Sequence, residues 1–170
     1  MGVENSPAPE GAVTITDMLS DLHAQDKQVR ARAAADLAAL GSPAVDPLVA
    51  TLRDPRWEVR YRAAEALGQI RDPRVCPVLT SILDDPRDHV RYMAAKGLGI
   101  QRCPGAVAGL CRVLEDENEY VRRIAAGSLA AVGHPSAIPS LRDRLVRESS
   151  PTVRDAIIRA CHSLVKTPRT

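Results

Sequence analysis

The chain has 170 residues, a net charge of +2 and no phenylalanine, and aromatic residues make up only 2% of it. This length supplies one domain with a continuous core, which has to be built from alanine, valine, leucine and isoleucine. So mild a charge does not support a nucleic-acid or membrane surface. The sequence also shows no signal peptide and no apolar run of about 18 residues, so we expect a cytoplasmic protein without a membrane segment.

The elements expected along the chain are almost all helical. Residues 1–12 contain proline, glycine and glutamate without periodicity, which predicts a flexible tail. An amphipathic helix at 14–23 is expected to cap the N-terminal end, because the ends of a repeat stack need a polar outer face. Four antiparallel helix hairpins are expected at 27–53, 57–84, 88–115 and 119–147. A closing helix follows at 151–165 and a short tail at 167–170. The sequence thus predicts one domain over 13–166 with about ten helices.

The hairpins are predicted from a repeat anchored on a Val-Arg pair. The pair occurs five times at steps of 30 to 32 residues, as Val29-Arg30, Val59-Arg60, Val90-Arg91, Val121-Arg122 and Val153-Arg154. A period in this range indicates stacked supersecondary units. In the first four units an alanine follows the valine by four positions and a leucine by eight, which places all three on one stripe of a helix. Leucines before the valine mark a second helix, and a proline separates the two.

The segment from Val59 to Gly68 carries a recognisable pattern. It reads V-R-Y-R-A-A-E-A-L-G and is followed by a proline, an L-x-x-x-L helix and an aspartate. This pattern resembles the HEAT-repeat family, in the short form found in phycobilisome-lyase-like proteins, and the resemblance covers about residues 14–166. It implies an all-α fold, an α-solenoid of HEAT-like or armadillo type. Most members of the family are binding scaffolds.

An acidic residue stands six positions before the arginine in four of the units. The pairs are Asp54 and Arg60, Asp85 and Arg91, Asp116 and Arg122, and Glu148 and Arg154. We expect them to form a ladder of charge-assisted bonds that ties loops to neighbouring helices. The alternative is a basic binding stripe, which is disfavoured because each arginine already has an acid nearby.

The outer face of the first helices holds the strongest binding candidates. Trp57, the only tryptophan, is followed one turn later by Tyr61, with Arg62 beside it and Tyr92 one repeat along. Trp, Tyr and Arg clustered on a surface are typical of protein-binding hot spots. Alternatively, Trp57 folds across the neighbouring loop and shields its own repeat.

The second helices are expected to line the concave surface, where solenoids usually bind. Ser81 and Arg112 are weaker candidates there. The exposed columns of these helices are small and mixed in charge, which suits an extended peptide or a protein surface. They show no basic track for nucleic acid, which stays a second alternative function.

Two enzymatic hypotheses follow from the resemblance. Deoxyhypusine hydroxylases have a similar repeat and bind a di-iron centre through His-Glu pairs two and three residues after the valine. In this sequence those positions hold pairs such as Tyr61-Arg62 and Tyr92-Met93, so the resemblance does not extend to the di-iron ligands. Bilin lyase subunits attach or isomerise a tetrapyrrole, and only the resemblance supports that activity. We therefore predict a non-catalytic interaction scaffold or adaptor with a protein partner and no cofactor, with a bilin lyase-type enzyme or subunit as the alternative.

The cysteines and histidines do not indicate a metal site. Cys76, Cys103, Cys111 and Cys161 show no C-x-x-C spacing, so we expect reduced core residues. The histidines occupy different repeat positions, and a shared loop column brings together only Cys103 and His134, too few ligands for zinc.

The closing helix departs from the repeat at two positions. Ile158 stands where other units have alanine, and Val165 stands where they have glycine or arginine. If this flank faces outward, its apolar strip predicts an end-to-end homodimer. The alternative is that these larger residues fold over the final core.

Overall fold

The structure is a computed structural model that describes residues 13–166. In this part of the chain every regular element is helical, as the repeat predicts. The tails expected at 1–12 and 167–170 lie outside the described residues. The first helices of the successive units are α2 (Lys27–Leu40), α4 (Trp57–Leu67), α6 (Asp88–Gln101), α8 (Glu119–Val132) and α10 (Pro151–Lys166). The second helices are α1 (Ile15–Asp21), α3 (Val45–Thr51), α5 (Val75–Ser81), α7 (Val107–Val113) and α9 (Ile138–Arg147).

Prolines set the connection between the two helices of a unit. Pro43, Pro104 and Pro135 each lie in the first turn of a short 3-10 helix that leads into the second helix, at Ser42–Ala44, Pro104–Ala106 and Pro135–Ala137. A proline is tolerated there because an amide in a first turn has no partner within the helix. The second helices α3, α5 and α7 have only 7 residues each.

The core is the predicted set of small and branched residues. Leu37, Leu67, Leu98 and Leu129, eight positions after each valine, are all almost fully buried. The anchoring valines are buried as well, except that Val29, in the terminal unit, is 38% exposed. One continuous apolar cluster therefore runs through the stack.

Glycines allow the first helices to approach closely. A Cβ atom on Gly68 of α4 would lie 3.0 Å from the Cα atom of Gly97 in α6. A Cβ atom on Gly99 of α6 would lie 2.9 Å from the Cα atom of Ser128 in α8. Only glycine permits such spacing, and the first helices accordingly form the most extensive contacts between successive units.

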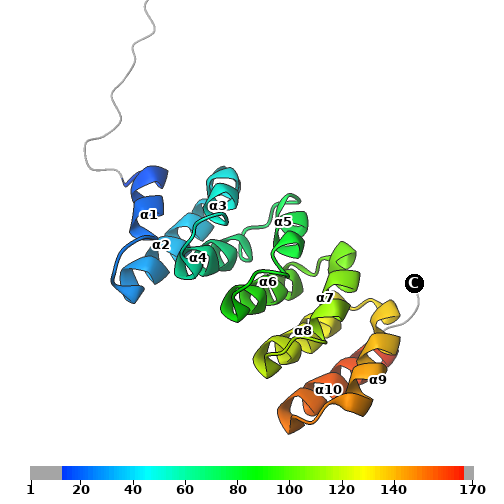
Figure 1. The fold of residues 1–170 in the computed structure, drawn as a ribbon. Coiled ribbons are helices and arrows are strands. Elements are labelled where there is room, and N and C mark those ends of the chain that lie inside the picture. Colours follow the sequence, from blue (N-terminus) through cyan, green and yellow to red (C-terminus); the bar gives the residue numbers. More distant parts are fainter. Residues whose placement is uncertain (1–12, 167–170) are drawn as a thin grey trace, which may run out of the picture.

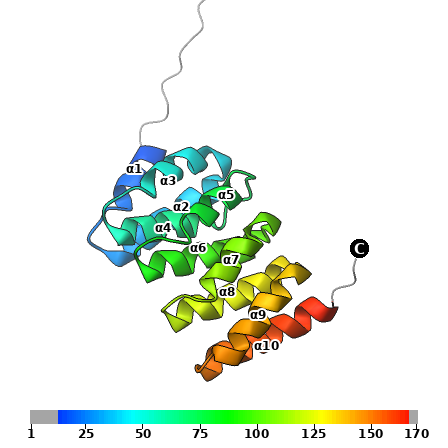
Figure 2. The same ribbon diagram turned by 45° about the vertical axis from the view of Figure 1, so that its right-hand side comes forward.

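Figures 1 and 2 show the hairpins stacked in sequence order, with α1 at one end and α10 at the other. In Figure 1 the second helices run along the outer side of the bend and the first helices along its inner side. The expectation that the second helices line the concave surface is therefore wrong. The physical reason is the close glycine-mediated packing of the first helices, combined with the shortness of the second helices, which pack mainly against the first.

The expectation of four reduced cysteines is also wrong. Cys76 of α5 and Cys103, which directly precedes the next 3-10 helix, form a disulfide with their Cα atoms 5.8 Å apart. The bond joins two successive units on the side of the second helices. Cys111 and Cys161 are free and half-buried, and burial raises the pKa of the Cys161 thiol. None of the helices among the described residues is long and apolar enough to span a membrane.

Candidate functional site

The arginine of each Val-Arg pair holds two loops together. Arg91 donates from Nε and Nη2 to the carboxylate of Asp116, at 2.7 and 2.9 Å, and from Nη1 to the backbone carbonyl of Asp85 at 2.9 Å. Arg60 does the same with the Asp85 carboxylate, at 2.8 Å for both bonds. The predicted pairs are therefore wrong in register. The carboxylates of Asp85, Asp116 and Glu148 accept from the arginine of the preceding unit, whereas that of Asp54 is bonded to His23. The acid six positions before an arginine offers that arginine its backbone carbonyl.

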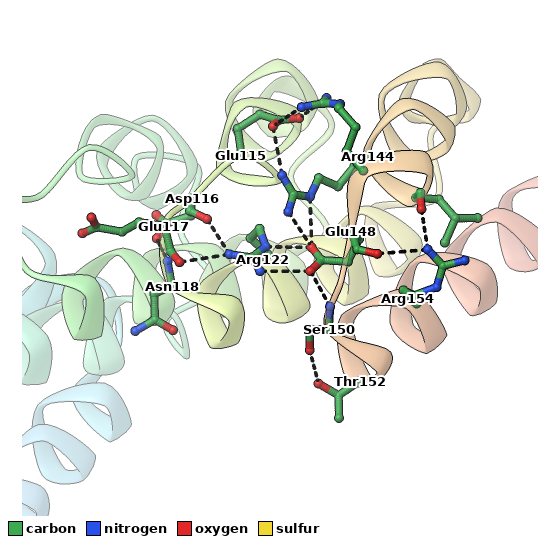
Figure 3. Close-up of polar contacts among 12 residues, drawn as sticks. Glu115, Asp116, Glu117, Asn118, Arg122, Arg144, Glu148, Ser150, Thr152 and Arg154 are labelled. Carbon is green, nitrogen blue, oxygen red and sulfur yellow. Dashed lines mark hydrogen bonds and ion pairs between the residues drawn. The ribbon is translucent and has the colours of Figure 1, made fainter.

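The last member of this ladder is the most buried. Arg122 donates to both carboxylate oxygens of Glu148, at 2.8 and 3.0 Å, and Glu148 also accepts from Arg144 and from the amide of Ser150 (Figure 3). The side chain of Glu148 is 0% exposed. These hydrogen bonds, above all those from Arg122, lower the pKa of Glu148 to about 2. Arg154 bonds only backbone carbonyls, those of Leu145 and Glu148.

The exposure of the ladder arginines decides whether they can form a basic binding stripe. The guanidinium groups of Arg60, Arg91 and Arg122 are each at most 12% exposed and each occupied by a carboxylate. Such groups are unavailable to a partner, so this arginine column joins the units of the solenoid.

A hollow of about 250 Å³ lies between the N-terminal ends of α4, α6 and α8. We call it the aromatic pocket, and its lining residues are Tyr61, Asp88, His89, Tyr92, Asn118, Tyr120, Val121 and Arg123. These include every tyrosine of the chain. The one tryptophan, Trp57, lies directly beside the pocket, because its ring is 4.9 Å from that of His89. All the aromatic residues of the sequence are thus gathered at one place.

The four first-helix residues predicted to bind a partner do not all lie in the pocket. Tyr61 and Tyr92 line the pocket. Trp57 is half-buried under the next unit, with the guanidinium of Arg87 4.7 Å from its ring centre, which corresponds to the alternative in which it folds across the neighbouring loop. Arg62 turns along its own helix, where Nη1 lies 2.6 Å from a carboxylate oxygen of Glu65.

Ser81 and Arg112 are not brought together with the aromatic residues. Both are exposed on second helices, on the other side of the solenoid. The Ser81 hydroxyl donates to the carbonyl of Val78 in its own helix at 2.7 Å. Arg112 lies 3.5 Å from Asp84 in an exposed ion pair.

Sequence reasoning missed several pocket residues. His89 and Tyr120 both stand one position before an anchoring valine, whereas Trp57 stands two before and Tyr61 and Tyr92 stand two after theirs. The neglected column reads Gln28, Glu58, His89, Tyr120 and Thr152. Its change from polar to aromatic residues in the middle of the chain was the available signal.

The polar groups of the pocket are fixed in place. Asp88 accepts from the amide and ring of His89, at 2.8 and 2.7 Å, and from Asn118 Nδ2 at 2.5 Å. The hydrogen bond from the His89 ring is the main reason why the pKa of Asp88 is lowered. Burial raises the pKa of Tyr61. The pocket therefore offers aromatic walls with a bonded carboxylate at one edge and Arg123, which lies 5.8 Å from the Tyr120 ring centre, at another.

The described residues do not include a group of three or more His, Cys, Asp or Glu side chains suited to a metal ion. Cys103 and His134, which share a loop column, are committed elsewhere. Cys103 is in the disulfide, and His134 Nδ1 lies 2.8 Å from the hydroxyl of Ser136. What the aromatic pocket presents is aromatic walls together with hydrogen-bonding groups.

Solved structures with a similar fold include natural and designed repeat proteins. The complex of CpcE and CpcF of phycocyanin lyase from Nostoc sp. PCC7120 matches with a TM-score of 0.73 and 26% identity, over 99% of this chain and 71% of that chain. The E. coli protein YIBA matches with a TM-score of 0.75 and 21% identity, over 90% and 59%. A designed armadillo repeat protein in complex with the peptide (KR)4 matches with a TM-score of 0.60 and 18% identity, over 88% and 81%. The last two likenesses show the fold alone.

A comparison with curated proteins finds no match. The family described as HEAT repeats matches residues 15–98 and again residues 77–161. These two matches span nearly all the described residues and include every one of the Val-Arg units. The chain therefore belongs to the HEAT-repeat family.

Proposed function

We propose that the protein is a non-catalytic interaction scaffold and that the aromatic pocket receives an apolar or aromatic side chain of a protein partner. One observation carries this proposal. A chain with 2% aromatic residues gathers all of them on and beside a single hollow. Tyrosine and tryptophan supply large contact areas at small entropic cost and are enriched in binding hot spots.

The comparisons support the class of function. CpcE and CpcF form a complex with each other, and the designed armadillo protein holds a peptide. The pocket here is built from three successive units, which is how a solenoid recognises a partner without any single unit forming a site.

The test starts from a displayed peptide library panned on the immobilised protein, followed by fluorescence anisotropy with the enriched peptides. Tyr120→Ala is the main variant, because Tyr120 is 59% exposed and its removal leaves the core intact. Val146→Ala is the matched control, because Val146 is 86% exposed on α9, away from the pocket. We expect Tyr120→Ala to weaken binding about tenfold or more, in the range of a hot-spot residue, and Val146→Ala to bind like the wild type.

Two results would contradict the proposal. One is a library that yields no peptide with an apolar or aromatic anchor. The other is an enriched peptide that binds Tyr120→Ala and Tyr61→Ala as tightly as the wild type. Circular dichroism of each variant separates lost binding from lost folding.

A second candidate function is that of a bilin lyase subunit. The observation that favours it is the 26% identity to the phycocyanin lyase complex over 99% of this chain. Absorbance spectroscopy after incubation with phycocyanobilin tests it directly. A tetrapyrrole band that stays with the protein through gel filtration would favour this candidate over the scaffold.

The partner of the closing helix is proposed to be a second copy of the chain. Ile158 and Val165 of α10 are 38% and 65% exposed, which supports an apolar strip at the C-terminal end of the stack. Light scattering at high micromolar concentration distinguishes the two states. A dimer mass that falls to a monomer mass in Val165→Glu is the expected result, and a monomeric wild type would exclude this dimer.

A further inference from the structure

Two further hollows lie beside the aromatic pocket on the same side of the solenoid. One hollow, of about 460 Å³, lies over α8 and α10, and another, of about 360 Å³, lies over α6 and α8. Both include Ile124 and Gly127 of α8 in their lining. The two hollows therefore flank one helix and form a single groove across the first-helix side of the C-terminal units.

The charged residues of this groove all have the same sign. They are Lys96, Arg102, Arg123 and Arg159, and neither hollow is lined by an aspartate or glutamate. We call this surface the cationic groove and define it by these four residues. Each of the four side chains is exposed. A ligand of negative charge would meet four cations there without a competing carboxylate in the lining.

These cations also differ from most arginines of the molecule in having no ion pair with any described residue. Carboxylates are close in sequence, because Glu119 precedes Arg123 by one helical turn and Asp155 precedes Arg159 likewise. Neither acid forms an ion pair with the arginine that follows it. An unpaired cation gains more from an incoming carboxylate than one that must first give up an existing partner.

The floor of the groove is apolar and made of small residues. Gly127 and Ala130 of α8 and Ala156 and Ala160 of α10 line the larger hollow. Ile100, which is 50% exposed, stands at the edge of the smaller one. The small side chains leave the room that bulky apolar side chains of a ligand would fill, and covering Ile100 would remove apolar surface from water.

We propose that the cationic groove binds an acidic segment of a partner protein, whose carboxylates pair with the four cations while its leucine-like side chains fill the two hollows. This rests on the proposed scaffold function and names the chemistry of its partner. Tyr92 and Arg123 line both the aromatic pocket and the groove, so one segment can occupy the two in succession. A nucleic acid fits less well, because the floor is apolar and the net charge of the chain is only +2.

The probe is a short fluorescein-labelled peptide of glutamate and leucine, titrated by fluorescence anisotropy at several salt concentrations. Lys96→Glu and Arg159→Glu test the groove, since neither residue lines the aromatic pocket. Arg53→Glu is the matched control. Arg53 lies just after α3, on the other side of the solenoid, and is an exposed cation that has no ion pair with a described residue. We expect each groove variant to weaken binding about tenfold, the control to change it less than about twofold, and salt to weaken the wild type most.

Three results would overturn the proposal. The first is that the wild type binds this peptide no more tightly than one with lysine in place of glutamate. Arg53→Glu could lose as much affinity as Arg159→Glu, which would show that only net charge matters. A single-stranded RNA oligonucleotide could bind more tightly than the peptide and displace it. Arg159→Gln, which removes the charge without reversing it, gives a smaller loss in the same direction if the groove is the site.

The two proposals fail separately. Tyr61 and Tyr120 line the aromatic pocket and not the groove, and Lys96 and Arg159 line the groove and not the aromatic pocket. If library peptides lose affinity in the tyrosine variants while the acidic probe binds nowhere, the scaffold function stands and the acidic partner is excluded. The reverse pattern retains the groove and excludes the pocket.

Discussion

The two sides of the solenoid differ in where cations without ion pairs gather, although Arg53 and Arg142 on the second-helix side also have no ion pair with a described residue. On the second-helix side, Glu115 is held by Arg144 and Arg147, and Arg74 is held by Asp46 and Asp72. On the first-helix side of the C-terminal units, Lys96, Arg123 and Arg159 have no ion pair with any described residue. The contrast begins at α6, since Arg32 and Arg62, on the earlier first helices, pair with acids of their own helix.

This difference supports the proposal that a partner binds on the first-helix side of the C-terminal units. A surface whose charges satisfy one another gains little from a charged ligand, because an existing bond has to break before a new one forms. A surface with unpaired cations and apolar hollows gains both ion pairs and buried area. The ladder of Arg60, Arg91 and Arg122 between the units then serves to hold the open side in register.

The largest effect is expected at the ladder. Glu148→Ala removes a fully buried carboxylate and leaves Arg122, 10% exposed, without its acid. Breaking a buried pair from one side costs about 3–5 kcal/mol of the free energy of unfolding, which urea denaturation followed by circular dichroism measures. The control is Asp84→Ala, whose carboxylate is 75% exposed and 3.5 Å from Arg112, and which should cost at most about 1 kcal/mol. Equal losses in the two variants would remove the distinction between ladder and surface pairs.

The same pair predicts a dependence on pH. The pKa of Glu148 is about 2 in the folded protein against an ordinary 4.5. Because folding lowers this pKa, the carboxylate contributes stability above pH 4.5 that is lost as the pH falls toward 2. Glu148→Gln cannot titrate there. The difference in stability between wild type and Glu148→Gln should therefore shrink over this interval, and a constant difference would argue against the strong pair.

Part of this organisation could be predicted from the sequence. The recurrence of Val-Arg, with alanine and leucine on the same stripe, is sufficient to place the helices and the core, since every unit repeats the same packing problem. The ladder's register could not be read in this way. In a repeat of about 31 residues, an acid six positions before one arginine also stands 25 positions after the previous one, and only the path of the loops decides between them.

The contribution of His89 and Tyr120 to the aromatic pocket, and the disulfide, were missed for a related reason. Both depend on contacts between successive units, whereas a column compares the same position in each unit. Cys76 and Cys103 belong to different columns and are 27 residues apart, a little less than one period, so their contact depends on how the units are offset. Tyr120, one position before its valine, likewise joins Tyr61 and Tyr92, which stand two positions after theirs, because α4, α6 and α8 approach so closely.

Two glycines of the first helices differ in their surroundings: Gly99 is packed between α6 and α8, and Gly127 is exposed in the groove. A Cβ atom on Gly99 would lie 2.5 Å from the hydroxyl of Ser128 and 2.9 Å from its Cα atom, so α6 and α8 would have to move apart. We expect Gly99→Ala to cost about 1–3 kcal/mol of stability. A Cβ atom on Gly127 would meet nothing within 4 Å, so Gly127→Ala in mid-helix should gain about 0.5–1 kcal/mol.

The Gly127→Ala variant also tests where the acidic probe binds. The added methyl group of Gly127→Ala stands in the lining of both hollows. This variant should therefore melt at a higher temperature than the wild type and yet bind the acidic probe more weakly. Thermal unfolding and anisotropy on the same preparations measure both. Unchanged probe affinity in Gly127→Ala would move the contact away from α8.

The smallest effect is expected at the C-terminal end of α6. Arg102 has φ 51° and ψ 48°, the only positive φ of a non-glycine residue among those described. Gly41 and Gly133, at the same repeat position, also have positive φ. A side chain in this conformation costs about 1 kcal/mol. Glycine removes that cost but gains freedom in the unfolded chain, so Arg102→Gly should stabilise by at most about 0.5 kcal/mol.

Arg102→Gly also separates stability from binding, because it removes a cation of the groove. The variant should be at least as stable as the wild type and bind the acidic probe more weakly. Arg71→Gly is the matched control, since Arg71 has the same repeat position but not a positive φ. It should gain no stability, because glycine there only adds freedom to the unfolded chain. If both variants gained alike in urea denaturation, the left-handed turn would not explain the effect, and if probe affinity were unchanged in Arg102→Gly, the groove would end at Lys96.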